Sequence, residues 1–360
     1  MAVHIDEPFH GAVINHRHGT QGDGELRLTV QGRAGLDERV TVQGEKVRRQ
    51  GEAFAAEIAL RHRETDIVAR ADGPAGSSAH RVRVLWDRHS RPRYRFSVDD
   101  NSFFLRDVAQ QGYRSLFDCF YLAGLRDLHQ KYGARFVLNI YYATEDGFEL
   151  PSFPDRYRGE WADCAHWLKL AFHARANKPD WPYLHASAEQ LAADFDQVAE
   201  QILRFAGEAA YSPPTVIHWG MVQPSALPCL YERGVRALSG FFLCREGHWT
   251  VNYRLDAARS EYLSRHDALV DFDSGITFSN VDLVCNNTPV DSIAPQLDPL
   301  PDDPARAEIV DLFTHEQYFW PFYANYLPDH PKRLDAAIRW VTDHGYQPVF
   351  FHEGLLGGRQ

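Results

Sequence analysis

The chain has 360 residues, of which 44% are hydrophobic and 13% aromatic, so it is long enough for one large domain together with a smaller one. Its formal net charge of -11 disfavours binding to nucleic acid or to an anionic membrane surface. No apolar run approaches the roughly 20 residues that cross a bilayer, so we expect neither a nucleic-acid partner nor a membrane partner.

The cysteine usage and the N-terminus bear on the cellular compartment. The five cysteines are odd in number and show no CxxC spacing. The first residues lack the basic and apolar segments of a signal peptide. These features predict reduced thiols in a cytoplasmic protein. The sequence leaves open whether the chain forms a homo-oligomer.

Residues 1–93 are predicted to form a small all-β, sandwich-like domain. Segments that alternate between apolar and polar residues recur at 25–30, 39–42, 54–60 and 80–86, with glycine and aspartate between them. Short strands at this spacing are typical of β-sandwiches. The sequence does not decide whether this domain binds sugar, covers one side of an active-site cleft or assists oligomerisation.

Residues 94–360 are predicted to form an α/β domain in which strands alternate with helices. The helical patterns cover 115–131, 187–206 and 331–344. The predicted strands are 94–99, 134–142, 168–173, 214–218, 235–242, 277–285, 308–315 and 347–352. This alternation indicates βα units with a parallel sheet, and seven or eight strands in this length fit one barrel-like domain.

Polar side chains gather at the carboxyl ends of these predicted strands. In chain order they are Asp99 and Asp100, Asn139 and Tyr141, His173, His218 and Trp219, and His315 and Glu316. The carboxyl ends of parallel strands meet on one face, where active sites lie. We therefore expect these residues to describe one metal or acid/base site.

The adjacent carboxylates Asp99 and Asp100 suggest a division of roles. Neighbouring side chains of a strand point to opposite faces, so one aspartate can bind a metal while the other stays free as a base. Oxygen and imidazole ligands suit zinc or another first-row divalent metal. The alternative is a plain turn, because aspartate and asparagine both favour turns.

Aromatic and charged residues near the predicted histidines suggest a sugar site. Aromatic faces stack on sugar rings while neighbouring polar groups bond the hydroxyls. The alternative is that these aromatics pack in the core and loops. The predicted substrate-binding residues are Asn139, Tyr141, Arg175, Lys178, Asp180, Trp181, Trp219 and Tyr318.

The run Phe96-Ser97-Val98-Asp99-Asp100-Asn101 resembles the first motif of the polysaccharide deacetylases, the NodB-homology superfamily, which is usually Thr-Phe-Asp-Asp-Gly. The resemblance implies a distorted, incomplete (β/α) barrel with a divalent metal, most simply zinc. It also implies that Asp99 is the catalytic base and Asp100 a metal ligand. His315 resembles the late-strand histidine that acts as general acid.

The second motif of this superfamily, His-Ser/Thr-x-x-His, is matched only at its first position. His173 fits, but Ala174 replaces the hydroxyl residue and Asn177 stands where the second histidine belongs. Asparagine is a poor zinc ligand. Either another strand supplies the third ligand, with His218 as first choice and His315 as second, or the site has decayed.

The leading hypothesis is a metal-dependent hydrolase that removes acetyl groups from an N- or O-acetylated sugar or polysaccharide. Asp100, His173 and His218 hold the metal, with an open position for water. Asp99 accepts a proton, and His315 protonates the leaving group.

Three alternatives stay open. A glycoside hydrolase would use Asp99 and Glu316 as its carboxylate pair. A polysaccharide lyase would bind the carboxylate of an acidic sugar through Arg175 and Lys178. A non-catalytic sugar-binding protein would keep a degenerate site, which the incomplete second motif favours.

Overall fold

The structure, a computed structural model, describes residues 2–74 and 76–357, which divide into two compact units. The first unit comprises residues up to 90, the segment 268–273 and the described residues from 356 onward. The second comprises 91–267 and 274–355. The first unit thus differs from the predicted 1–93 domain, because it includes two short segments from the later part of the chain. Within the described ranges, no helix is both long and apolar enough to cross a membrane.

The first unit is built from two β-sheets. One has the order β1-β4-β8-β7, with β3 beside β4, and the other has the order β2-β10-β9-β5-β6. β4 buries every second residue because leucine and valine alternate with polar residues along it. The strands are β1 (His4–Glu7), β2 (Val13–Ile14), β3 (Thr20–Gln21), β4 (Leu26–Arg33), β5 (Arg39–Val42), β6 (Glu45–Lys46), β7 (Arg48–Gln50), β8 (Ala53–Leu60), β9 (Glu64–Gly73) and β10 (Gly76–Trp86), with β17 (Ala268–Asp271) in the later segment.

The second unit is centred on a parallel sheet of order β13-β12-β11-β20-β19, with β21 also paired to β11. The central strand β11 is buried along nearly its whole length, as expected for a parallel strand with both faces covered. A second parallel pair joins β14 to β18. The strands are β11 (Arg93–Asn101), β12 (Phe136–Tyr141), β13 (Leu168–Ala174), β14 (Ala237–Gly240), β18 (Ile276–Asn280), β19 (Leu283–Val284), β20 (Ile309–His315) and β21 (Gln347–Pro348).

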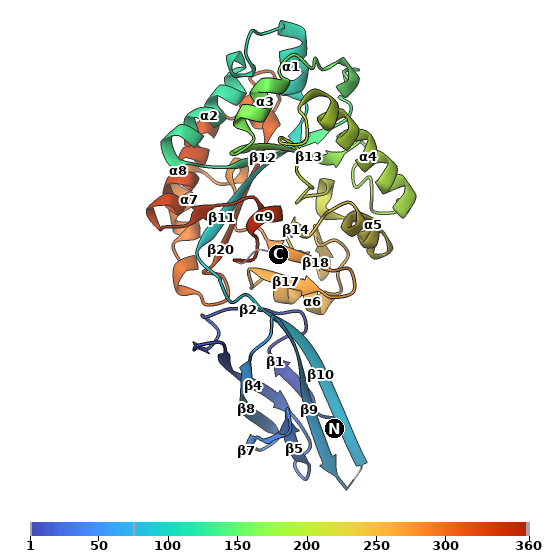
Figure 1. Cartoon of the computed structure of the whole chain (residues 1–360), viewed down its shortest axis with the longest axis vertical. Helices are drawn as coiled ribbons and strands as arrows, with labels where there is room; N and C mark the ends of the chain where they lie inside the picture. Colours follow the sequence, from blue (N-terminus) through green and yellow to red (C-terminus); the bar gives the residue numbers. More distant parts are fainter. Residues whose placement is uncertain (1, 75, 358–360) are drawn as a thin grey trace. The chain divides into compact units, whose positions relative to one another are not determined.

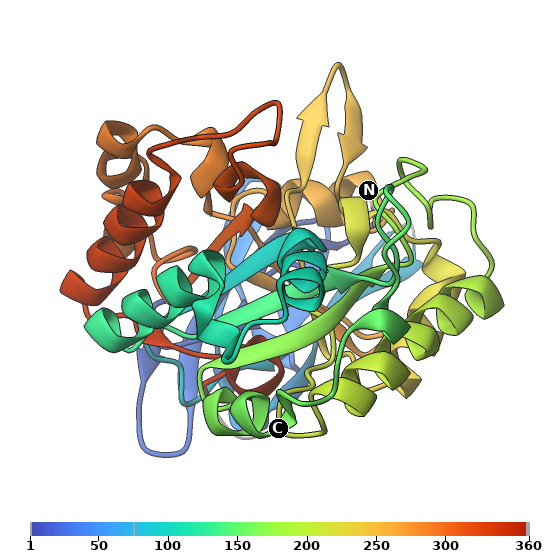
Figure 2. The ribbon, with the colours of Figure 1, turned by 90° about the horizontal axis from the view of Figure 1, so that it is seen from above.

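Helices connect and surround these strands (Figure 1). The longest, α4, begins where the Ser187 side chain accepts a hydrogen bond from the Gln190 N–H, and it buries one apolar face. A two-stranded hairpin of β15 (Leu243–Arg245) and β16 (His248–Thr250) projects from this unit (Figure 2). The helices are α1 (Phe103–Gln111), α2 (Phe120–Tyr132), α3 (Arg158–Cys164), α4 (Ala188–Phe205), α5 (Leu227–Glu232), α6 (Ala257–Leu263), α7 (Val290–Leu297), α8 (His330–Asp343) and α9 (Phe351–Gly354).

The α/β class is confirmed, whereas the predicted distorted barrel stays a prediction. Among the described residues, the hydrogen-bonded strands form separate sheets rather than one closed ring. The predicted strand 214–218 is absent, because Pro213 and Pro214 cannot donate to a ladder. The segment 210–215 still lies beside two strands: Leu170 N donates to Ala210 O at 2.8 Å, and Ser239 N donates to Thr215 O at 2.7 Å. The predicted strand 347–352 is also wrong beyond Pro348, where α9 follows.

Candidate metal centre

Two β-bulges at neighbouring strand ends place the first two residues of the site. The β11–β12 register shifts between Val98 and Asn101, which gives β11 one extra residue, and Asp100 there has φ 60°. Aspartate tolerates this left-handed conformation better than most residues. The β12–β13 register also shifts, so that His173 is the additional residue of β13. Bulges re-aim side chains and are frequent beside active sites.

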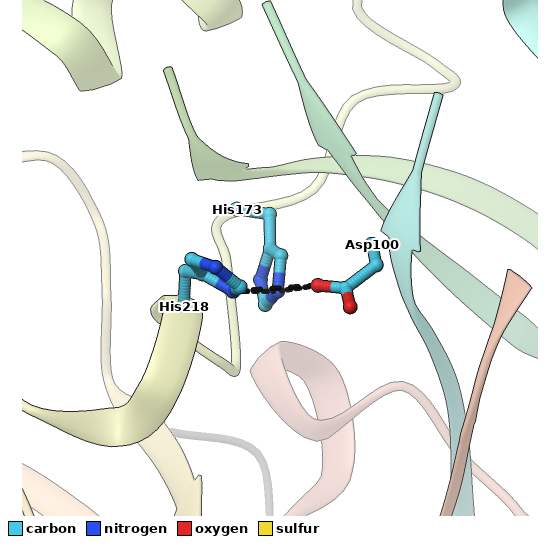
Figure 3. A group of neighbouring side chains, drawn as sticks. All are labelled: Asp100, His173 and His218. Carbon is cyan, nitrogen blue, oxygen red and sulfur yellow. Dashed lines mark hydrogen bonds and ion pairs between the residues drawn. The ribbon is translucent and has the colours of Figure 1, made fainter. Parts of the chain in front are cut away.

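His218 completes a cluster with Asp100 and His173 (Figure 3). It lies not at a strand end but at the start of the 3-10 turn His218–Gly220. Asp100 Oδ1 is 3.1 Å from His173 Nε2 and 3.3 Å from His218 Nδ1. The two imidazole nitrogens are 3.1 Å apart. The three side chains therefore direct one ligand atom each toward a common point.

The outward-facing nitrogens of both histidines contact main-chain carbonyl oxygens. His173 Nδ1 lies 3.4 Å from Val216 O, and His218 Nε2 lies 3.3 Å from Asn177 O. When these nitrogens carry the hydrogens, the other two present lone pairs to Asp100 Oδ1. Two lone pairs and a carboxylate oxygen at this separation repel one another unless a cation lies between them. The donor set thus fits a divalent metal ion.

The environment also favours an ionised Asp100. When the facing nitrogens carry the hydrogens instead, burial still acts to raise the pKa of this carboxyl, but hydrogen bonds from His173 and His218 hold it well below its usual range. Burial lowers the pKa of His218 despite its hydrogen bond to Asp100. Burial acts in the same direction on His173, but the hydrogen bond to Asp100 and the charge of Asp99 leave its pKa raised.

Two further side chains hold the Asp100 carboxylate. The Tyr141 hydroxyl donates to Oδ1, and Gln317 Nε2 donates to Oδ2 at 2.9 Å. Tyr141 was predicted to bind substrate, but it is buried and contacts the cluster itself. Gln317 was missed, although it follows His315 and Glu316 directly at the end of β20.

Asp99 and His315 lie side by side on neighbouring strands, as Cα partners in the β11–β20 register. Asp99 Oδ1 accepts from Asn139 Nδ2 at 2.6 Å and from Ser97 Oγ at 3.2 Å. Its Oδ2 has no hydrogen-bond partner within the described part of the chain. His315 Nδ1 lies 2.9 Å from Asn286 Oδ1. Asn139, predicted to bind substrate, thus orients Asp99 in this structure.

A cavity of about 360 Å³ contains this centre. Both aspartates line it, because the bulge interrupts the alternation that would send them to opposite faces. The predicted residues in its wall are Asp99, Asp100, His173, His218, Trp219, His315 and Tyr318. Asn177 and Tyr323 also lie in the wall, as do Arg95, Phe241, Arg245 and Gln317, which the sequence did not indicate. Arg245 lies on the β15–β16 hairpin, whose position no local pattern predicts.

The structure places Glu316, for which a catalytic role was predicted, at the N-terminus of α1. Its fully buried carboxylate accepts hydrogen bonds from the N–H groups of Ser102, Phe103 and Phe104, at 2.6, 2.9 and 2.5 Å, and from Trp320 Nε1 at 3.1 Å. It therefore caps the N-terminus of α1, which the Ser102 side chain leaves uncapped. Glu316 does not belong to the wall of the cavity.

Most of the loop after His173 also lies away from the cavity wall. Arg175 donates to Gln197 Oε1 at 2.6 Å, and Lys178 pairs with Asp180 at 2.7 Å. Trp181 is 47% exposed, and its ring lies edge-on to Trp219 at 5.6 Å between centroids. Trp181 thus contacts Trp219 of the cavity wall.

Comparisons with known proteins leave the family open. No family model and no curated protein matches the sequence. The peptidoglycan deacetylase PdaC from Bacillus subtilis is 12% identical over 72% of this chain and 87% of its own, with a TM-score of 0.34. A family 4 acetyl xylan esterase from Clostridium thermocellum, solved with a cobalt ion, is 13% identical over 71% and 86%, with a TM-score of 0.33.

A modular endo-β-1,4-mannanase from Cellulomonas fimi is also similar, at 22% identity over 24% of this chain and a TM-score of 0.18. The match spans only 18% of the mannanase. These likenesses establish neither a family nor an activity for this chain.

Proposed function

We propose that this protein is a divalent-metal hydrolase that removes an acyl group, most simply acetyl, from a carbohydrate. The observation that carries the proposal is the convergence of Asp100 Oδ1, His173 Nε2 and His218 Nδ1 in the cavity that Asp99 and His315 also line. One carboxylate with two imidazoles, beside a potential base and a potential acid, is the set that metal-assisted acyl hydrolysis needs. The resemblance of residues 96–101 to the first deacetylase motif supports the same proposal.

Asp100, His173 and His218 would hold the metal. When bound, the ion would supply Lewis-acid activation of the acyl carbonyl and of the attacking water. Zinc suits this ligand set best, and cobalt or another first-row divalent ion suits it as well.

Asp99 would accept the proton of the attacking water. Asn139 and Ser97 fix Oδ1 of its carboxylate, which leaves Oδ2 for proton transfer. His315 would donate a proton to the leaving sugar oxygen or nitrogen. Its contact with Asn286 Oδ1 engages Nδ1 and leaves Nε2 for that role.

The wall of the cavity supports a saccharide as the substrate. Trp219, Phe241, Tyr318 and Tyr323 line it, and aromatic faces of this kind stack on the C–H faces of sugar rings. Glu316 caps α1, and Arg175 and Lys178 bond to other side chains outside the cavity wall, which favours acyl hydrolysis over the glycosidase and lyase alternatives.

The test combines metal analysis with an assay for the bond that is cleaved. Purified protein should contain about one equivalent of a divalent metal, and chelation should abolish acetate release from a panel of acetylated oligosaccharides. Zinc or cobalt should restore it. New reducing ends without acetate would indicate a glycosidase, and protein that binds no divalent metal would refute the proposal.

A further inference from the structure

The first unit contains a cavity of about 250 Å³ that is separate from the metal centre in sequence and in composition. Its wall consists of residues from the β8–β9 connection, the end of β10 and the segment after it, and one residue near the C-terminus. They are Arg61, Arg63, Leu85, Trp86, Asp87, Arg88, His89 and Leu356. Three arginines and a histidine thus face a single carboxylate.

The positive charge of this cavity is not balanced by its own side chains. Asp87 is buried, and both of its carboxylate oxygens accept from the Gly357 N–H, at 2.9 and 3.0 Å. Arg61 pairs with Glu25 at 2.8 Å. Arg63 and Arg88 form no ion pair with any residue that the structure describes, and both are exposed.

Trp86 provides a second, independent indication of a ligand. Its side chain is 3% exposed, and its Nε1–H has no hydrogen-bond partner among the described residues. A buried donor without an acceptor costs about 1–3 kcal/mol. Trp86 N donates to Arg63 O at 2.6 Å, and the Arg88 guanidinium lies 5.5 Å from the indole ring. The indole N–H of Trp86, which lacks a hydrogen-bond partner, therefore belongs to a residue that contacts both Arg63 and Arg88.

We propose that this cavity binds an oxyanion, a phosphate, sulfate or carboxylate group carried on a small molecule or a sugar. Guanidinium groups recognise such oxyanions through paired, charge-assisted hydrogen bonds, and the indole N–H adds a neutral donor. The volume is below the roughly 300–1,000 Å³ of typical ligand pockets, which fits an oxyanion with at most one sugar ring. Residues 1–90 and 268–273 contain 13 basic and 15 acidic side chains, so most of the net charge of -11 resides in the remainder of the chain and does little to repel an anion from this unit.

The experiment is a calorimetric titration of the full chain at low salt with sodium phosphate, sodium sulfate, glucuronate and, as the neutral comparison, glucose. We expect saturable binding of at least one anion and none of glucose. Binding of glucuronate alone would identify an acidic sugar, whereas binding of phosphate or sulfate would identify a tetrahedral anion as the ligand.

Substitutions then locate the binding. R63Q and R88Q should each raise the Kd for the anion about tenfold or more, which is the loss of affinity expected for a charge-assisted hydrogen bond. R70Q makes the same charge change on β9, outside the cavity, and should leave Kd within about twofold. W86F keeps the ring and removes the donor, so it should weaken binding while thermal unfolding shows that the chain stays folded. Absence of saturable anion binding, or equal effects of R70Q and R63Q, would overturn the proposal. Because the experiment measures anion binding, its outcome does not depend on whether the proposed hydrolase activity is found.

Discussion

The main-chain carbonyl oxygen of Asn177 lies 3.3 Å from His218 Nε2. Asn177 occupies the position at which the deacetylase motif has its second histidine, so the departure from that motif has a structural counterpart. The Asn177 side-chain oxygen accepts from the Tyr141 hydroxyl at 3.3 Å, while its main-chain carbonyl contacts His218 of the metal-competent group. In the proposed metal site, the third ligand therefore comes from a different segment of the chain, at His218.

Substitution of Asn177 tests this relationship. N177A keeps the carbonyl oxygen, so we expect its metal affinity to fall less than about tenfold, the lower end of the effect of outer-shell changes. H218A removes a ligand atom and should lower the affinity by well over 100-fold. Competition with a chelator of known affinity measures both. If N177A lost the metal as completely as H218A does, the asparagine side chain would itself be a ligand.

Substitutions should distinguish the proposed roles of the adjacent Asp99 and Asp100. D100A removes a ligand, so purified protein should lack the stoichiometric metal. D99N keeps the three ligands and loses only the proton acceptor, so it should retain the metal while turnover falls about 10²- to 10⁴-fold, the usual contribution of a general base. Metal analysis and an acetate-release assay on the same preparations measure the metal content and the turnover. Loss of metal from D99N would show that Asp99 is a ligand.

Strand-end reasoning brought Asp100, His173 and His218 into one group because parallel strands converge at their carboxyl ends. It could not predict how Asp99 and Asp100 come to line one cavity. That depends on a bulge in the pairing of β11 with β12. The register is set by how two strands pair, so the sequence of β11 alone does not determine it. The same reasoning misplaced His218 on a strand, because Pro213 and Pro214 prevent the apolar run before His218 from pairing as a strand.

Glu316 shows a second limit of the sequence. Its position after His315 made it a reasonable partner for Asp99, yet three of its four hydrogen-bond donors are backbone groups more than 200 residues away. The sequence near Ser102 does not indicate that a distant carboxylate caps α1. The local sign in the structure is that the Ser102 side chain makes no cap hydrogen bond. The overall α/β order was easier to predict, because it follows from local periodicity.

Replacement of Glu316 should therefore affect stability rather than chemistry. E316A leaves three N–H groups at the N-terminus of α1 and the Trp320 N–H without their acceptor, which should lower the free energy of unfolding by about 2–4 kcal/mol. E200A, on the exposed face of α4, is the matched control and should change it by less than about 0.5 kcal/mol. Denaturant unfolding measures both. A loss of turnover in E316Q at unchanged stability and metal content would restore the catalytic role.

His330 should make the fold sensitive to acid. It is fully buried, its Nε2 lies 2.9 Å from Thr314 Oγ1, and burial together with the charge of Arg333 lowers its pKa to about 3. The unfolded chain takes up this proton near pH 6.5, whereas the folded chain resists it. The unfolded state therefore binds more protons between about pH 6.5 and pH 3, and stability falls as the pH drops through that window.

The size of this effect follows from the same linkage. The free energy of unfolding of the wild-type chain should be about 2 kcal/mol lower at pH 5 than at pH 7.5 because of His330. H330Q keeps a partner for Thr314 but does not titrate, so the wild-type-minus-H330Q difference in unfolding free energy should shift by that amount between the two pH values. Taking the difference removes the other titrating groups common to both proteins. A difference that stays constant with pH would mean that the buried imidazole is protonated equally readily in the folded and unfolded chains.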